Sequence, residues 1–227
     1  DKLEEAKQMD PSDPIIHFAL AEILYYDGQY LRATHEYEIV LDTGEYEVNG
    51  VNLFSRIADC SLQSGNYTDA VEFFDEISEE EMTSEDYFKK AIAYDKNDLT
   101  QEAIKLLRTL LSKDPDFIQA YYYLQQLYVH EKEYDQAIEM GNEGLRLDQF
   151  YKELMTNTGS IELEHGDASD GVKHLIQALE VDNSYQQPLL TLSEFYREQE
   201  DYESLITLLQ YVDEEEIDPV FAWHLAY

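Results

Sequence analysis

Six histidines are the residues of this chain best suited to acid–base or metal chemistry, so their spacing is the first test of an enzymatic role. His130 is followed by Glu131, but Tyr134 stands where the second histidine of a helical zinc motif would lie. His165 and His174 could in principle form a small metal or acid–base cluster. Matches this weak arise mostly by chance. The sequence therefore favours a solvated turn residue and a separate second-helix residue, and we expect no catalytic site, no metal site and no cofactor.

Acidic side chains dominate the charge of the chain. The sequence holds 50 Asp and Glu residues against 15 Lys and Arg residues, a formal net charge of −35. Such a field repels phosphate backbones and anionic lipid heads, so we expect neither nucleic acid nor a membrane as a partner of this segment. The acidic run at 213–216 could attract calcium or a basic partner, but runs of this kind are more often solvated loops.

The single cysteine, Cys60, limits the cross-links that the chain can form. It excludes an intramolecular disulfide and a Cys/His zinc framework. No apolar run reaches the length of about 18 residues expected of a membrane-spanning helix, and the first ten residues do not resemble a secretory signal. These features favour a cytoplasmic location.

Small residues recur at regular spacing along the chain, and this ladder of small residues indicates the helices on which any functional site must lie. Ala33, Ala70, Ala103, Ala137 and Gly171 lie 37, 33, 34 and 34 residues apart. Each follows a short polar turn and precedes an apolar stripe with helical spacing. A period near 34 residues predicts an all-α solenoid in which antiparallel helix pairs stack and share a core.

Extending this register divides the chain into six full units with part of a unit at each end. Three extra residues near the end of the first full unit are expected to widen one inter-unit loop. Both termini are expected to cut through units, so the chain resembles a fragment of a longer array. The expected divisions are 1–13 (second-helix remnant of a preceding unit), 14–50, 51–83, 84–117, 118–151, 152–185, 186–219 and 220–227 (start of a following unit).

Glycines occupy two kinds of position in this register. Gly28, Gly65 and Gly166 share one turn position, where we expect the chain to leave the first helix in a left-handed conformation. Gly141 and Gly144 fall inside an expected second helix, where each costs about 0.5–1 kcal/mol relative to alanine. This part of the array should therefore be looser than the rest or pack unusually closely.

The pattern resembles the tetratricopeptide repeat (TPR). Tyr87, Ala91 and Tyr94 fit the pattern of its first helix, and Ala103 and Pro115 fit the second helix and its exit. The resemblance covers essentially the whole chain and implies a right-handed superhelix whose first helices line a concave wall. Long acidic arrays that look like this occur in Gram-positive bacteria, which implies a non-catalytic scaffold or adaptor.

The resemblance also implies which residues line the concave groove. They are first-helix residues that alternate with the packing positions, and they mix aromatic and aliphatic side chains with carboxylates and amides. Such a surface suits a protein or peptide segment with apolar anchors and basic residues between them. Phe88, Tyr122 and Tyr123 could each instead pack between adjacent first helices. The implied partner-binding residues are Phe18, Glu22, Tyr25, Tyr26, Asn52, Arg56, Asp59, Phe88, Lys89, Ile92, Tyr122, Tyr123, Gln126, His130, Asn157, Glu194 and Arg197.

One known TPR ligand is disfavoured by the residues present. TPR domains that bind chaperone tails hold a terminal carboxylate with a clamp of Lys, Asn and Arg, but Phe18 and Glu22 stand at the first two clamp positions. Two alternatives to a groove that binds a different protein stay open. The chain could self-associate into a homo-oligomer, or its acidic surface could mimic nucleic acid and capture a basic protein.

Overall fold

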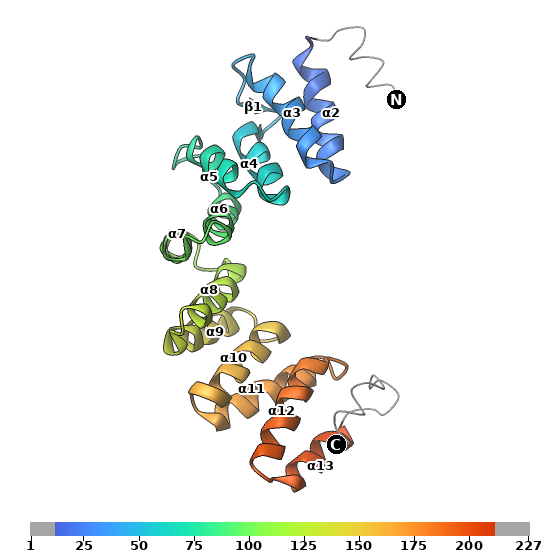
Figure 1. Cartoon of the computed structure of the whole chain (residues 1–227), viewed down its shortest axis with the longest axis vertical. Coiled ribbons are helices and arrows are strands. Elements are labelled where there is room, and N and C mark those ends of the chain that lie inside the picture. Colours follow the sequence, from blue (N-terminus) through green and yellow to red (C-terminus); the bar gives the residue numbers. More distant parts are fainter. Residues whose placement is uncertain (1–11, 212–227) are drawn as a thin grey trace. The chain divides into compact units, whose positions relative to one another are not determined.

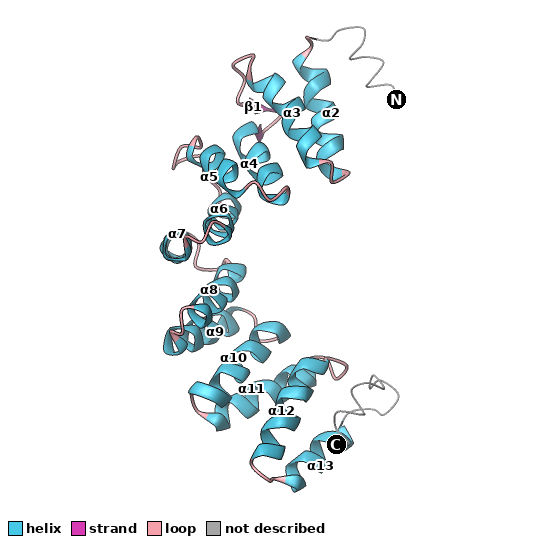
Figure 2. Ribbon diagram, viewed as in Figure 1, coloured by secondary structure: helices cyan, strands magenta, loops and turns pink. Residues whose placement is uncertain are grey.

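The computed structural model describes residues 12–211 and shows an all-α protein (Figures 1 and 2). Within this range, twelve helices follow one another as six pairs, and the chain divides into two compact units between Pro115 and Asp116. The expectations for 1–11 and for 212–227, including the acidic run and the unit expected from 220, lie outside the described residues. None of the described helices is both long and apolar enough to cross a membrane.

The two units contain the same kind of helix pair. Unit 1 holds α2 (Pro14–Tyr26), α3 (Tyr30–Leu41), α4 (Leu53–Gln63), α5 (Tyr67–Asp75), α6 (Ser84–Lys96) and α7 (Thr100–Lys113). Unit 2 holds α8 (Ile118–His130), α9 (Tyr134–Leu147), α10 (Lys152–His165), α11 (Ala168–Val181), α12 (Gln186–Glu198) and α13 (Tyr202–Tyr211).

Two of the three glycines expected at the turns have the predicted conformation. Gly28 and Gly65 have φ values of +74° and +80°, in the left-handed region that suits glycine. The expectation for Gly166 is wrong, because its φ is −127°. An added Cβ at Gly166 would lie 2.9 Å from Ile138 Cδ1 and 3.1 Å from Glu162 Cα, so glycine is needed there for close packing.

The wide loop expected before 51 is an ordered hairpin. β1 (Glu47–Val48) pairs antiparallel with β2 (Val51–Asn52), and the two turn residues between them both have positive φ. Val48 and Val51 face each other and pack against the core shared by α2, α3 and α4. The hairpin therefore extends the hydrophobic core of unit 1.

The small residues of the ladder are buried where the second helix packs, as the ladder predicts. Gly171 on α11 gives the closest approach, because its added Cβ would lie 2.7 Å from the carbonyl oxygen of Gly159 on α10. An added Cβ on Gly144 would lie 2.6 Å from Leu154 Cδ2. Of the two outcomes expected for the glycine-rich region, the structure shows the close packing.

The pair α8–α9 exchanges a small and a large residue relative to the other pairs. Gln125 on α8 is fully buried, and Gly141 on α9 leaves the space for it, since an added Cβ would lie 2.3 Å from Gln125 Nε2. The equivalent positions of the earlier pairs carry Ala21 with Tyr37, Ala58 with Phe74, and Ala91 with Leu107. A polar side chain from the first helix therefore fills the volume that an apolar second-helix residue fills elsewhere.

Candidate protein-binding surface

The first helices of neighbouring pairs contact one another directly. In unit 1, Arg56 on α4 donates a hydrogen bond to Glu22 on α2, and α4 contacts α6. In unit 2, α8 is bonded to α10 through Gln125 and Thr158, and α10 contacts α12. Each unit therefore has a continuous first-helix face, formed by α2, α4 and α6 in unit 1 and by α8, α10 and α12 in unit 2.

Arg56 organises one end of the first-helix face of unit 1. Its Nε donates to Glu22 Oε1 at 3.1 Å, and its guanidinium lies 4.5 Å from the ring centre of Tyr25 and 5.8 Å from that of Tyr26. Glu22 also accepts a hydrogen bond from the hydroxyl of the buried Tyr37. Burial and this carboxylate hold the pKa of Tyr37 well above its usual value, so the phenol stays a donor.

Asp59 joins three first helices of unit 1. Its Oδ2 accepts from Lys89 Nζ on α6 at 2.8 Å and from the hydroxyl of Tyr25 on α2, while Gln63 on its own helix donates to Oδ1. Burial is the largest influence on this carboxyl and opposes ionisation, but the hydrogen bonds from Lys89 and Tyr25 together outweigh it and lower the pKa of Asp59. The network therefore holds a negative charge in a nearly closed site.

Replacing Asp59 by asparagine should destabilise unit 1 by about 1–3 kcal/mol near neutral pH, because Lys89 loses its buried charged partner. Since the folded pKa of Asp59 is lowered, its ionised form stabilises the fold above the ordinary value of 3.8. This contribution is lost as the pH falls from there through the lowered folded pKa. Urea unfolding of the wild type and the variant as a function of pH measures the difference.

The matched control for Asp59→Asn is Glu72→Gln on the exposed side of α5. This control should change the free energy of unfolding by less than about 0.5 kcal/mol. If the two substitutions had equal effects at neutral pH, Asp59 would have no special structural role.

The structure corrects two residues of the expected groove set. Phe18 is only 7% exposed and lies in the core with the ring of Tyr37, 6.3 Å away between centroids. Asp59 is 3% exposed and its oxygens are already bonded within the chain. Neither side chain is available to a partner, because each is used to pack one helix against another.

The other expected groove residues keep some or much of their surface. Tyr26, Gln126, His130, Glu194 and Arg197 are exposed, whereas Glu22, Tyr25, Asn52, Arg56, Phe88, Lys89, Ile92, Tyr122, Tyr123 and Asn157 are partly buried. Two ion pairs neutralise the charges at the centre of unit 1, Glu22 with Arg56 and Asp59 with Lys89. The face of unit 1 is therefore largely engaged with itself.

The first-helix face of unit 2 contains an uncharged hollow between α8 and α10. The hollow has a volume of about 250 Å³, and its walls include Val129 and Ile161 beside the amide side chains of Gln126 and Asn157. Neither of these two amides makes a hydrogen bond to another residue in the described part of the chain. The hollow therefore presents neutral donors and acceptors between apolar walls.

Gln125 forms the inner side of this hollow. Its Nε2 donates to Thr158 Oγ1 at 2.7 Å and to the carbonyl oxygen of Ala137 at 3.4 Å. The hydroxyl of Thr158 itself donates to the carbonyl oxygen of Leu154, so Thr158 can only accept from Gln125. This fixes the orientation of the amide and leaves Gln125 Oε1 buried without a partner among the described residues.

Sequence reasoning identified Gln126 and Asn157 but missed Gln125. The available signal was its type, because the equivalent positions of the three preceding units carry alanine. The ring of Tyr122 on α8 packs against that of Tyr151, the residue before α10, with centroids 5.5 Å apart.

His165, His174 and Cys60, the reactive groups considered from the sequence, contact other residues of the fold. His174 Nδ1 lies 2.7 Å from Glu162 Oε2, whereas His165 stacks on Tyr134 with ring centroids 3.5 Å apart. The two histidines suggested by the sequence therefore have different partners, and the described residues contain no group of three His, Cys, Asp or Glu side chains placed to hold a metal. Burial raises the pKa of the Cys60 thiol to about 11, so it is protonated at neutral pH.

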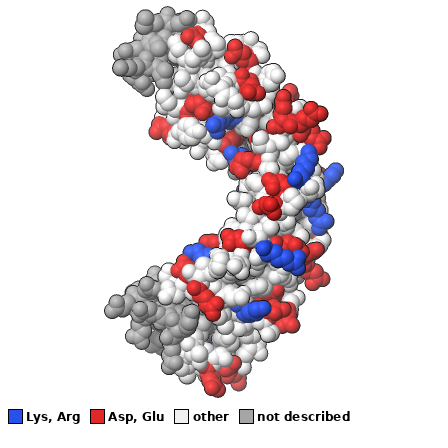
Figure 3. All heavy atoms as spheres, turned by 180° about the vertical axis from the view of Figure 1, so that it is seen from behind, with Lys and Arg blue, Asp and Glu red and all other residues white. Residues whose placement is uncertain are grey.

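Acidic side chains are spread over both units. On the face shown in Figure 3, Asp and Glu side chains are distributed along the chain, and Lys and Arg side chains lie in small groups between them. This distribution fits the formal charge of −35 and gives the described surface a negative electrostatic potential.

Helix pairs with a period near 34 residues, joined through adjacent first helices, make this chain a tetratricopeptide repeat protein. Family models described as "YpiA-like, tetratricopeptide repeats" and "Tetratricopeptide repeat" match residues 1–45 and 96–157. The TPR repeat-containing protein YpiA of Bacillus subtilis (strain 168) is 31% identical over 226 residues, which cover 99% of this chain and 53% of YpiA. The chain thus spans about half the length of this relative.

Solved structures share the fold. A crystal structure of MamA has a TM-score of 0.66 and 21% identity, over 75% of this chain and 92% of MamA. YrrB, described as a TPR protein with an unusual peptide-binding site, has a TM-score of 0.63 and 13% identity, over 83% of this chain and 96% of YrrB. At these identities the likeness concerns the fold alone.

Proposed function

We propose that this chain is a non-catalytic scaffold whose first-helix face in unit 2 binds a segment of another protein. The observation that carries the proposal is the hollow between α8 and α10, where Gln126 and Asn157 have unused amide groups beside apolar walls. Main-chain amides of an extended segment can pair with such groups without the cost of burying a charge.

The chemistry of the partner follows from the surroundings of the hollow. Tyr122 and Tyr123 lie on the same helix and are partly buried, which suits an apolar anchor of the partner. The net charge of −35 favours basic residues in the segment around that anchor. Protein interaction is also the general role of TPR modules, and YrrB is described as having a peptide-binding site. A cytoplasmic location, suggested by the single cysteine, belongs to the same proposal.

The test is a double substitution of Tyr122 and Tyr123 by alanine. Proteins captured by the wild type are identified, and the affinity of the purified partner is then measured by isothermal titration calorimetry. We expect the double variant to bind at least about tenfold more weakly, since buried aromatic anchors contribute 1.4 kcal/mol or more in such interfaces. Tyr46→Ala, at an exposed loop tyrosine of unit 1, is the matched control.

Unchanged affinity in the Tyr122 and Tyr123 variant would overturn the proposal. A steep fall in affinity with salt together with indifference to both tyrosines would instead favour the acidic mimic of nucleic acid. Light scattering over a range of concentrations checks for self-association, which would show as a molar mass that rises with concentration.

A single substitution tests the hollow itself. Asn157→Ala should weaken binding of the same partner about three- to tenfold, the effect of losing one hydrogen bond of about 0.5–1.5 kcal/mol. Asn157 makes no hydrogen bond within the described residues, so the free energy of unfolding should stay nearly unchanged. Calorimetry and urea unfolding of the same preparation separate the two effects.

A further inference from the structure

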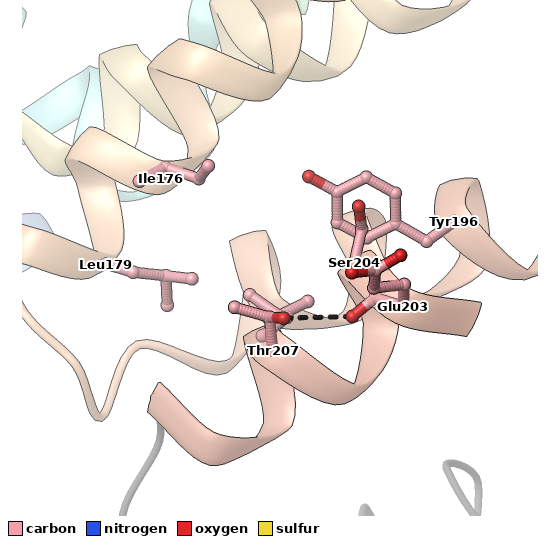
Figure 4. A pocket seen from close by; sticks show the side chains of 7 residues that line it. Ile176, Leu179, Tyr196, Glu203, Ser204 and Thr207 are labelled. Atoms are coloured by element: carbon pink, nitrogen blue, oxygen red, sulfur yellow. Dashed lines mark hydrogen bonds between the residues drawn. The ribbon is translucent and has the colours of Figure 1, made fainter. Parts of the chain in front are cut away.

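The pair α12–α13 departs from the others at the residue that sets how closely two helices approach. The other five pairs carry alanine or glycine at this position, whereas α13 carries Leu205. A leucine cannot support the backbone approach seen between Gly159 and Gly171. Beside this pair, between α11 and α13, lies an open pocket of about 430 Å³ (Figure 4).

The pocket has an apolar interior. Ile176 and Leu179 line it from α11, and Leu208 lines it from α13. Leu179 and Leu208 are buried, but Ile176 keeps 38% of its surface exposed. Figure 4 shows the ring of Tyr196, from α12, on the other side of the space from Ile176. The volume is sufficient for one large apolar side chain, and such apolar pockets with a few polar groups are typical ligand sites.

The described lining of the pocket contains one carboxylate. Glu203 on α13 is exposed and forms no ion pair with any residue in the range 12–211. The hydroxyl of Thr207 donates to the main-chain oxygen of Glu203 at 2.9 Å, so it is already used (Figure 4). No Lys or Arg is among the described residues that line the pocket. The unpaired carboxylate beside apolar walls favours a ligand that is apolar and carries a positive charge at one end.

We propose that this α11–α13 pocket is a second docking site, separate from the first-helix face. It takes an aromatic or long aliphatic side chain from a protein segment that has a Lys or Arg next to that side chain. A second copy of this chain is the poorer occupant, because it would bring another formal charge of −35 to the same acidic surface.

Three probes of one shape and different charge test the proposal: phenethylammonium, phenethyl alcohol and hydrocinnamate. Methyl NMR signals of Ile176, Leu179 and Leu208 report binding. We expect saturable shifts of these methyl groups, with affinity highest for the ammonium, lower for the alcohol and lowest for the carboxylate. Ile176→Asp should reduce the affinity of phenethyl alcohol and of hydrocinnamate by at least about tenfold, because it places a charge beside the apolar walls that hold the ring.

Glu203→Gln separates the role of the rim from that of the apolar walls. This substitution at an exposed residue should lower the affinity for phenethylammonium about threefold, which is the effect of losing one surface ion pair. The affinity for phenethyl alcohol should stay unchanged. Glu72→Gln on α5 removes the same charge at a position far away in the sequence, and it should change the affinity of neither probe. The Tyr122 and Tyr123 double variant should also bind all probes normally. The pocket proposal can therefore be wrong while the proposed function is right, and the proposed function can be wrong while the pocket proposal is right.

Three results would overturn the proposal. The first is equal affinity for the ammonium and the carboxylate, and the second is a set of phenethyl alcohol shifts that persist in Ile176→Asp. The third is occupation of the pocket by residues 212–227 of the chain itself, which contain its single tryptophan, Trp223. In that case the probes would fail to bind, and Ile176→Asp would shift the fluorescence of Trp223.

Discussion

Replacing Gly171 by alanine is expected to destabilise unit 2 by about 1–3 kcal/mol, the usual cost of overpacking a tight interface. The added Cβ would lie 2.7 Å from the carbonyl oxygen of Gly159 and 2.8 Å from the main-chain nitrogen of Leu163. Both are backbone atoms of α10, so neither can rotate aside as a flexible side chain would. The two helices would have to separate.

The sign of this effect is informative. Alanine is the better helix former, so helix propensity alone predicts that Gly171→Ala stabilises α11 by about 0.5–1 kcal/mol. Urea unfolding followed by circular dichroism measures which effect is larger. Lys173→Ala, an exposed position on the same helix, is the control and should stay within about 0.5 kcal/mol of the wild type. A Gly171→Ala protein as stable as the wild type would refute the close helix crossing.

Gln125 and Gly141 together fill a space that a small and a large residue fill in the opposite order in the preceding pairs. We therefore expect substitutions at these two positions to compensate for each other in the free energy of unfolding. Gly141→Leu alone should destabilise unit 2 by about 1–3 kcal/mol, since even an added Cβ would lie 2.1 Å from Thr158 Oγ1 and 2.3 Å from Gln125 Nε2. Gln125→Ala alone should also be destabilising by about 1–3 kcal/mol, because it leaves a cavity and removes the hydrogen bond to Thr158.

The double variant Gln125→Ala, Gly141→Leu restores the small and large residues found at these positions in the preceding pair, Ala91 and Leu107. It should be more stable than Gly141→Leu, with a coupling energy between the two sites of about 1–3 kcal/mol. A double-mutant cycle from urea unfolding measures this energy. Simple additivity of the two substitutions would show that Gln125 and Gly141 do not share one packing site.

The all-α fold could be predicted from the sequence because the same physical requirement recurs in each pair. A second helix can approach the first only where its side chain is small, so Ala33 and its equivalents marked every pair but the last. Turn glycines were less reliable as a guide. Lys132 and Glu200 reach the left-handed conformation without glycine, whereas Gly166 does not adopt it.

The contacts of the candidate surface could be predicted only in part. The repeat register gave the helix on which each residue lies, but not which side chains pair across helices. Asp59 and Lys89 are 30 residues apart, and their contact depends on how α4 and α6 are placed. The register also gave no reason to expect Phe18 in the core, because a residue at the edge of a helix face can turn toward either side. Gln125 was missed because its side chain is polar, although the register places it where the preceding pairs carry buried alanine.

Site-specific photo-crosslinking tests the central claim most directly. A photoreactive amino acid placed at Gln126 lies on the first-helix face of unit 2 beside the hollow, and one placed at Lys105 lies on the exposed side of the second helix α7. With the partner identified by capture, we predict efficient crosslinks from position 126 and none above background from position 105. Crosslinks of equal yield from both positions, or from position 105 alone, would contradict binding on the first-helix face.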